Sequence, residues 1–301
     1  MASSTASNSQ IARATGMLVI EVVNSNPNGD PDRESDPRQR PDGRGEISPV
    51  SFKRKLRDLV EEKEGPVWKY LSKQLDLEVD GFHVLESRER VRKEIEKELE
   101  NGRFREKYWD GRVFGNTFLE KGGSDTVKTG VVQFALGLSV SPITIERMTN
   151  TNKTGVQEGK DRGMAPLGYR IVQHGVYHMP FFVNPTAAVK SGCTTKDIEL
   201  LYRLIPHAYS HTASYVRPFV GIRYAWLVEH KSPLGSCSDF ALLDALRPRK
   251  KPQPDQPSTS WDDYKELTPT ELPKELAVKA HPLRDLVKEF EDEFRTNPTG
   301  A

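Results

Sequence analysis

The chain has 301 residues, of which 36% are hydrophobic and 29% charged, and its formal net charge is +1. This composition allows one packed core, but so neutral a chain can bind a polyanion only through local clusters of lysine and arginine. The two cysteines, Cys193 and Cys237, exclude a disulfide framework and a cysteine-rich zinc site, and they favour a reducing cytoplasm. No apolar run is long enough for a membrane span, and residues 1–16 resemble a disordered polar tail rather than a secretory signal.

The first predicted element is a buried strand over residues 17–23, an apolar run rich in β-branched side chains. It ends in a dense turn signal at 24–31, after which a polar, arginine-bearing loop continues to about residue 48. A helix is predicted over 50–62, because apolar residues recur there at helical spacing. Residues 85–107 are almost entirely charged and predict a solvated helical insertion with paired charges along its faces.

A long polar segment separates the next two predicted strands. The strands cover residues 131–140 and 172–183, and the segment between them, 145–170, is longer than an ordinary connection. We therefore predict a projecting hairpin whose tip has a function.

The last predicted elements complete an alternating order of strands and helices. A helix over 195–209 opens with a capping signal at Thr194, and a strand follows at 220–230. Residues 247–274 predict a Pro-rich linker and 284–294 a short terminal helix. The order strand, helix, insertion, strand, strand, helix, strand predicts an α+β fold of the ferredoxin or RNA-recognition type.

The sequence offers weak candidates for catalysis or metal binding. Two pairs of histidines are spaced four residues apart, His174 with His178 and His207 with His211, but neither has the glutamate of a zinc-binding HExxH motif. Satisfied core or surface histidines are the simpler interpretation. The acidic loop with Asp30, Asp32, Glu34 and Asp36 could hold a divalent ion for phosphodiester cleavage. Arginines are interleaved with these acids, which favours neutralised turn and capping roles.

The predicted helix at 50–62 carries the strongest cationic cluster. Its spacing places Lys53 and Arg54 on the same face as Arg57, and Ser51 lies in the first turn. Cations at a helix start can follow phosphates, and the N–H groups of the first turn assist them. An ordinary basic surface helix is the alternative.

The predicted hairpin combines cations with apolar side chains. A cationic arm with an apolar wedge can unstack a base while it holds the backbone. Simple packing within the hairpin is an equally good explanation of its methionines. The residues concerned are Arg147, Lys153, Lys160, Arg162, Arg170, Met148 and Met164.

Ordered motifs across residues 17–246 resemble the Cas-seven family, the backbone subunit of the type I CRISPR complex Cascade, in its type I-C and I-B forms. The most specific match is a strand followed by NPNGDPD and then by the basic helix. Shorter motifs follow in the same order. The matching segments are NPNGDPD at 26–32, PR at 37–38, FKRKLRD at 52–58, VFG at 113–115, TGVVQF at 129–134, DRG at 161–163, HGVYHMPFFVNP at 174–185, a capped helix start at 194 and SYVR at 214–217.

The resemblance implies an RNA-recognition-like palm with a helical finger insertion at about 63–112 and a β-hairpin thumb at about 145–170. It implies that copies stack along the CRISPR guide RNA (crRNA) and that each thumb turns one base outward, so that the guide pairs with target DNA in short segments. In this interpretation Ser51, Lys53, Arg54 and Arg57 hold guide phosphates, and Asn26, Asn28 and Gly29 shape the loop beside the RNA. The full set of residues predicted at the RNA site is Asn26, Asn28, Gly29, Arg38, Ser51, Lys53, Arg54, Arg57, Arg147, Met148, Arg162, Met164 and Arg217.

The implied partners are the crRNA, the target DNA strand, further copies of the chain, the subunits that bind the crRNA 5′ handle, the large and small subunits, and a recruited helicase-nuclease. The resemblance implies no cofactor, no metal and no catalytic residue. Related type III backbone subunits cut target RNA with a loop aspartate, so a metal-dependent endoribonuclease that uses Asp30 or Asp32 is the alternative. A generic RNA-binding domain that works alone is a third. The sequence departs from the family pattern at Pro218, and residues 247–301, the Pro-rich segment and terminal helix, lie outside the resemblance.

Overall fold

The computed structural model describes residues 10–87, 97, 104–115, 129–152, 165–251, 253–266 and 268–296. Its centre is an antiparallel sheet with strand order β10-β9-β1-β8-β6-β4. Two further strands, β5 and β7, pair with other parts of β8. The strands are β1 (Ala14–Ser25), β4 (Arg44–Ile47), β5 (Val132–Phe134), β6 (Gly137–Pro142), β7 (Ile145–Asn152), β8 (Ala165–Val183), β9 (Val220–Glu229) and β10 (Arg284–Asp285), and a separate pair is formed by β2 (Gly29–Asp30) and β3 (Asp36–Pro37).

The central strand β1 is buried on both faces, which explains its continuous apolar sequence. Leu18 and Ile20 belong to a core on one side of the sheet, and Met17 and Val19 belong to a core on the other. The strand begins at Ala14, which lies within the segment 1–16 that the sequence predicted as a tail, and residues 1–9 lie outside the described residues.

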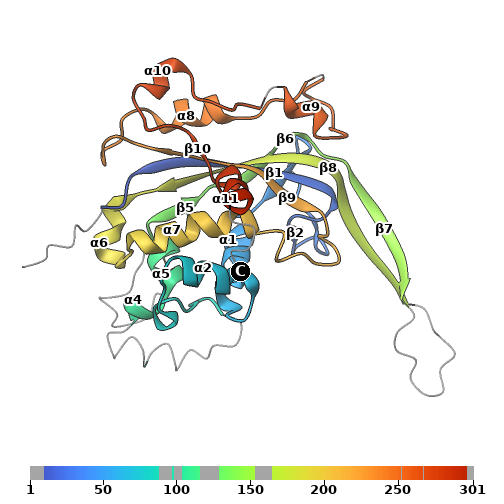
Figure 1. The fold of residues 1–301 in the computed structure, drawn as a ribbon. Coiled ribbons are helices and arrows are strands. Elements are labelled where there is room, and N and C mark those ends of the chain that lie inside the picture. The colour runs from blue at the N-terminus through green and yellow to red at the C-terminus, as the bar shows by residue number, and fades with distance from the viewer. Residues whose placement is uncertain are drawn as a thin grey trace, which may run out of the picture.

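Helices cover both faces of the sheet (Figure 1). One face carries the helices that lie between β4 and β9 in the chain together with α11, and the other carries short helices of the C-terminal part of the chain (Figure 1). The first group is α1 (Pro49–Glu61), α2 (Pro66–Gln74), α4 (Phe104–Lys107), α5 (Trp109–Phe114), α6 (Ala188–Ser191), α7 (Thr195–Leu204) and α11 (Leu286–Thr296); the second is α8 (Asp239–Leu246), α9 (Asp262–Lys265) and α10 (Lys274–Ala277).

The Pro-rich segment at 247–274 packs against the sheet, whereas the sequence predicted a linker. Tyr264 is fully buried in the second core, and Leu272 is 8% exposed there. The Tyr264 hydroxyl also shares a hydrogen bond with Ser141 Oγ at 2.8 Å. A sheet whose second face is apolar needs a cover, and this segment supplies it.

Two predicted elements are interrupted where a proline removes a backbone donor. The predicted strand 131–140 is divided into β5 and β6, and Ala135 at the break donates its N–H to the carbonyl of Pro180 on β8 at 2.8 Å. Pro180 cannot donate in return, so the ladder changes register there. The predicted helix 195–209 likewise ends as α7 at Leu204, and Ile205–His207 form a 3-10 turn that contains Pro206.

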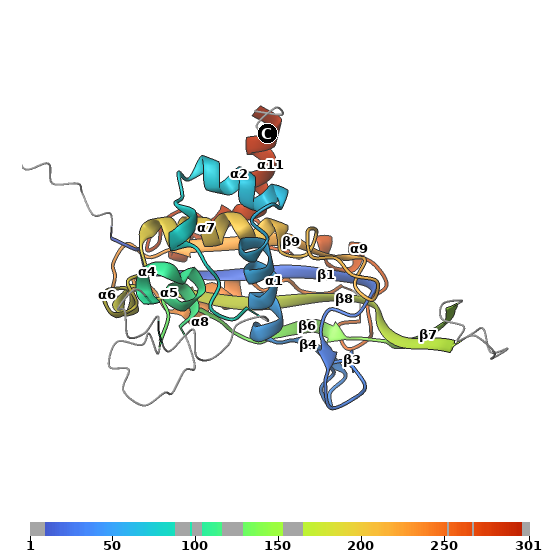
Figure 2. The same ribbon diagram turned by 90° about the horizontal axis from the view of Figure 1, so that it is seen from below.

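The predicted hairpin is present. β7 pairs with the first part of β8 from Ile145↔Val172 to Asn152↔Ala165, and the hairpin extends well beyond the sheet (Figures 1 and 2). We call it the thumb. Most of the charged insertion at 85–107 lies outside the described residues, and α4 is its described end. Within the described part of the chain, no helix is both long and apolar enough to cross a bilayer.

Candidate nucleic-acid interface

Asn28 fixes the start of α1 from the loop that follows β1. The Ser48 N–H donates to Asn28 Oδ1 at 2.7 Å, and Ser48 Oγ in turn accepts from the Ser51 N–H at 3.2 Å as the N-cap of α1. The side chain of Asn28 is buried. Gly29 lies beside it at a close approach of two chain segments, because a Cβ there would be 2.9 Å from the carbonyl oxygen of Ser35. These residues therefore shape the loop and orient α1.

Asn26 joins the same loop to the turn that precedes β9. Its N–H donates to the Val216 carbonyl at 2.7 Å, and its own carbonyl accepts from Arg217 Nε at 2.9 Å. The side-chain Nδ2 donates to the Ser35 carbonyl at 2.7 Å. Asn26 Oδ1 and Arg38 Nε are buried without a partner among the described residues, and each such atom costs about 1–3 kcal/mol. The hydrogen bond between Arg217 and Asn26 joins two loops that are 191 positions apart in the sequence.

The three α1 cations that the sequence assigned to RNA, Lys53, Arg54 and Arg57, have different environments. Arg57 is 3% exposed and lies among the apolar residues of the helix, because its Nε donates to the buried Asp110 Oδ2 at 2.8 Å. Arg54 is partly buried and pairs with Asp58 at 2.7 Å and with Glu61. The predicted cationic face therefore loses Arg57, whose guanidinium is satisfied inside the fold.

Lys53 is the α1 cation that lies at the surface next to an aromatic ring. Its Nζ is 5.1 Å from the ring centroid of Phe114. Partial burial lowers the pKa of Lys53, and the neighbouring Arg57 lowers it further. A phosphate beside Lys53 would offset both effects, so this side chain suits an anionic ligand.

The base of the thumb has two chemically different faces. Residues directly opposite each other in an antiparallel pair share a face, so Met148 lies beside Tyr169 and Arg147 beside Arg170. The Tyr169 ring contacts the Tyr215 ring at 5.3 Å between centroids. Arg170 forms an ion pair with Asp36. Arg162 and Met164, the other predicted thumb contacts, lie outside the described residues.

Two carboxylates of the acidic loop, those of Asp30 and Asp36, face arginines. Besides the Asp36–Arg170 pair, Asp30 Oδ1 lies 3.8 Å from Arg38 Nη2, and it accepts from the Asp32 N–H at 3.2 Å. Among the residues that the structure describes, no three histidine, cysteine or acidic side chains are grouped so that they could hold a metal ion. These contacts agree with the neutralised turn roles that the sequence favoured.

The histidines of the two predicted pairs lie in hydrogen-bonded or buried surroundings. His174 Nδ1 lies 2.7 Å from Ser258 Oγ and its Nε2 lies 3.2 Å from Glu21. The rings of His207 and His211 are 5.4 Å apart, and burial lowers the pKa of His207 to about 4.

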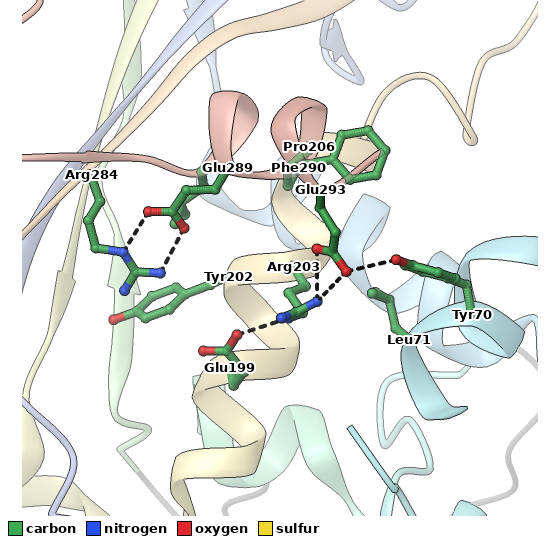
Figure 3. Close-up of a pocket in the computed structure, with 11 residues that line it drawn as sticks. Tyr70, Leu71, Glu199, Tyr202, Arg203, Pro206, Arg284, Glu289, Phe290 and Glu293 are labelled. Atoms are coloured by element: carbon green, nitrogen blue, oxygen red, sulfur yellow. Dashed lines mark hydrogen bonds and ion pairs between the residues drawn. The ribbon is translucent and has the colours of Figure 1, made fainter. Parts of the chain in front are cut away.

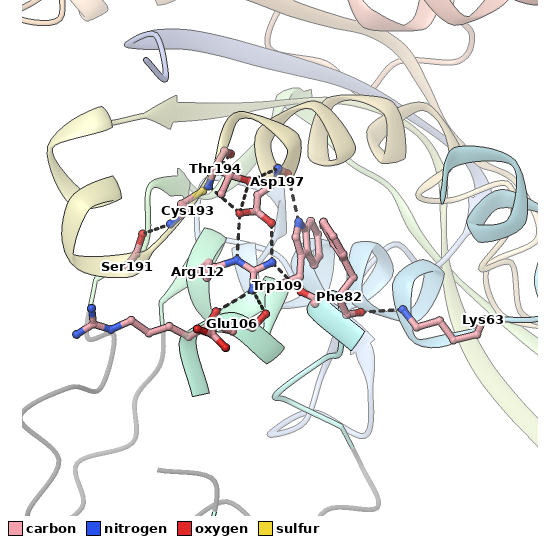
Figure 4. A network of polar contacts seen from close by, with 11 residues as sticks. Lys63, Phe82, Glu106, Trp109, Arg112, Ser191, Cys193, Thr194 and Asp197 are labelled. Atoms are coloured by element: carbon pink, nitrogen blue, oxygen red, sulfur yellow. Dashed lines mark hydrogen bonds and ion pairs between the residues drawn. The ribbon is translucent and has the colours of Figure 1, made fainter. Parts of the chain in front are cut away.

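A buried ion pair between Arg112 and Asp197 connects α5 to α7 (Figure 4). Arg112 Nη2 donates to Asp197 Oδ1 at 2.7 Å, and Arg112 Nη1 donates to the carbonyls of Arg105 and Glu106, each at 2.8 Å. Asp197 also completes the predicted capping box with Thr194. This network fixes the helices that support α1.

The terminal helix α11 is held by a second polar cluster, at a cavity of about 120 Å³ (Figure 3). Glu293 accepts from the Tyr70 hydroxyl at 2.8 Å and from Arg203 Nη1 at 3.1 Å, so α11 joins α2 to α7. Arg284 and Glu289 form a two-point ion pair beside it. Because these charges are already paired, we interpret the cavity as a gap where α11 packs against α2 and α7 rather than as an anion site.

Three aromatic residues near the thumb were not predicted from the sequence. Tyr169 lies on β8, and Tyr215 and Phe219 flank Arg217 in the segment that precedes β9. The available signal was the pair of aromatic residues around Arg217 and Pro218. Only the contacts of this segment with β1 and the thumb show that they belong to the same region.

The fold defines an α+β protein with an antiparallel sheet, helices on both faces and a projecting hairpin beside a loop rich in arginine. The chain belongs to the CRISPR-associated protein Cas7 family, whose model matches residues 12–268. The family resemblance predicted from the motifs is thus confirmed. No curated protein matches the chain.

Among solved structures, the chain is similar to a chain of a "CRISPR RNA-guided surveillance complex, pre-nicking" at 16% identity and a TM-score of 0.47, with 72% of this chain and 75% of that chain covered. A second "CRISPR RNA-guided surveillance complex" has 16% identity and a TM-score of 0.38, with coverages of 70% and 68%. A "Type III-B Cmr-beta bound to cognate target RNA" has 10% identity and a TM-score of 0.42, with coverages of 72% and 61%.

Proposed function

We propose that the protein is a guide-RNA-binding backbone subunit of a CRISPR surveillance complex and that it has a structural rather than a catalytic role. The observation that carries the proposal is the family match over residues 12–268. In this proposal, copies of the chain assemble along the crRNA, and the target DNA strand and the other subunits of the complex bind the resulting filament.

We infer that the sheet is an RNA-recognition-like palm. Its core strands follow the order β9-β1-β8-β6, and along the chain they alternate with α1 and α7 as strand, helix, strand, strand, helix, strand. This is the arrangement of the split β-α-β fold. The proposed thumb is the β7–β8 hairpin, where Met148 and Arg147 face opposite sides and could wedge a base and hold its phosphate.

The proposed RNA path runs past the start of α1, the loop at 26–38 and the base of the thumb. Lys53, Arg38, Arg147 and Arg217 are the candidate phosphate contacts along it. Asn26, Asn28 and Gly29 shape the loop, and Arg57 supports α1 from within. The ribonuclease alternative receives no support from the acidic loop, where Asp30 and Asp36 face arginines.

The proposal is tested with the full-length protein, a labelled single-stranded guide-like RNA and magnesium. Large regular assemblies with intact RNA support a backbone role. Magnesium-dependent RNA fragments that disappear in Asp30→Ala or Asp32→Ala would instead establish a nuclease.

Phosphate contact is tested by Lys53→Glu, with Lys279→Glu as the matched charge reversal at an exposed position just after α10. Lys53→Glu is expected to weaken binding of all RNA sequences and to reduce the salt dependence by about 0.7 in the slope of log affinity against log salt for each lost phosphate contact. Arg54 is left intact, because a glutamate there would face Asp58 and Glu61. Equal affinities of the two variants across salt concentrations would remove Lys53 from the RNA path.

A further inference from the structure

The segment that precedes β9 holds two aromatic residues on a fixed backbone. Ser214 and Arg217 close a tight turn, in which the Arg217 N–H donates to the Ser214 carbonyl at 2.8 Å, and Tyr215 lies at its tip. The Phe219 N–H donates to Ser25 Oγ at 2.9 Å, and its carbonyl accepts from the Val23 N–H at 3.0 Å. Together with the two bonds to Asn26 described above, these contacts lock the segment to the end of β1.

Both rings are largely exposed despite this rigid support. Tyr215 is 59% exposed and Phe219 is 63% exposed. Burying an aromatic ring stabilises a protein, so an exposed ring on an ordered backbone indicates a surface that a partner covers. The ordered backbone also lowers the entropic cost of binding.

The neighbours of these rings are Arg217 and a further aromatic ring. Arg217 lies between them in sequence, and its Nε is held by the Asn26 carbonyl. Tyr169 at the base of the thumb contacts Tyr215, and the exposed Arg147 lies on the opposite face of the same hairpin. Aromatic faces beside a cationic path are the composition that binds single-stranded nucleic acid without sequence preference.

We propose that Tyr215 and Phe219 are a stacking site for unpaired bases of single-stranded RNA at the base of the thumb. This inference rests on the proposed function and adds base contacts to a path assigned so far through phosphates. A second copy of the chain is the competing occupant. Arg217 favours the polyanion, because two copies that met through this segment would bring their Arg217 cations together.

The inference is tested with two short RNAs of equal length, one ordinary and one abasic, each short enough for a single copy of the full-length protein. The abasic RNA keeps the phosphates and lacks the bases. The variant is Tyr215→Ala with Phe219→Ala, and Phe240→Ala is the control, because Phe240 is 82% exposed on α8, on the opposite face of the sheet. Thermal unfolding is measured for each variant, and Tyr215→Trp with Phe219→Trp serves as the conservative rescue.

The double alanine variant is expected to bind the ordinary RNA about 5- to 150-fold more weakly for each base that stacks and the abasic RNA as tightly as the parent. The tryptophan variant should bind both as the parent does. An equal loss on both RNAs, or no loss on either, would overturn the stacking site alone. Reduced self-association of the alanine variant without RNA, at unchanged RNA affinity, would assign the rings to a second copy. A parent protein that binds neither RNA would refute the proposed function itself.

Discussion

Replacement of Arg57 by alanine is expected to destabilise the fold while the folded protein keeps its affinity for RNA. The Asp110 carboxylate is 1% exposed and accepts from Arg57 Nε at 2.8 Å. Without the guanidinium it would keep the N–H groups of Leu85 at 2.6 Å and Glu86 at 3.2 Å. A buried carboxylate would then lack its counter-charge.

Loss of one partner from a buried ion pair costs about 3–5 kcal/mol, against a total stability of about 5–15 kcal/mol for a typical domain. Removal of both partners in Arg57→Met with Asp110→Leu should recover part of that loss, because no unpaired charge remains. The matched surface control is Lys69→Ala, whose partner Glu64 is 84% exposed and whose own side chain is 59% exposed. A surface pair of this kind contributes about 0–1 kcal/mol.

Urea unfolding followed by tryptophan fluorescence gives the free energy of unfolding for the parent, the two single variants and the double variant. RNA affinity is then measured without urea, at a temperature where every variant is folded. If Arg57→Ala unfolds at the same urea concentration as the parent and binds RNA at least tenfold more weakly, the structural role assigned to Arg57 is wrong.

Two further predictions concern the sheet and the helical layer. Gly16→Ala should cost about 1–3 kcal/mol or more, because its Cβ would lie 2.2 Å from the Phe181 ring; an unchanged melting temperature would contradict this packing. The pKa of His207 in the folded protein is lowered to about 4 from 6.5, by burial and then by His211. The stability that neutral His207 contributes is therefore present above pH 6.5 and is lost as the pH falls toward 4, by about 3 kcal/mol. Urea midpoints of His207→Gln should fall less than those of the parent between pH 7 and pH 4, and parallel profiles would refute the assignment.

Elements with a strong local pattern were predictable from the sequence. The helix α1 follows from the periodic Phe52, Leu56, Leu59 and Val60, all of which are buried. The capping box at Thr194 is present as expected. Such features depend on residues within one or two turns of each other, so a single sequence contains the information.

Features that depend on distant partners were not predictable. The break between β5 and β6 results from Pro180 on the neighbouring strand, about 45 positions away. The segment around Tyr264 lacks a periodic pattern, yet it covers a sheet face that is apolar because β1 is buried on both sides. Composition indicated a linker there, and tertiary burial determined the outcome.

The same limit applied to the candidate site. Helical spacing grouped Lys53, Arg54 and Arg57, but it could not show that Asp110, 53 positions later, withdraws Arg57 from the surface. The hairpin itself was evident from the length of its polar segment. Its aromatic neighbour Tyr215 was not, because their contact joins residues 46 positions apart across two loops.

The contacts at the thumb give the NPNGDPD loop a mechanical role beside any direct RNA contact. One face of the thumb base meets Tyr215 through Tyr169, and the other meets Asp36 through Arg170. Asn26 holds both supports, since it bonds the carbonyl of Val216 and the carbonyl of Ser35. In the proposed function the thumb unstacks a base, which costs a few kcal/mol. The loop after β1 contacts both supports of the thumb base, so we expect the residues that orient α1 to hold the thumb in its position as well.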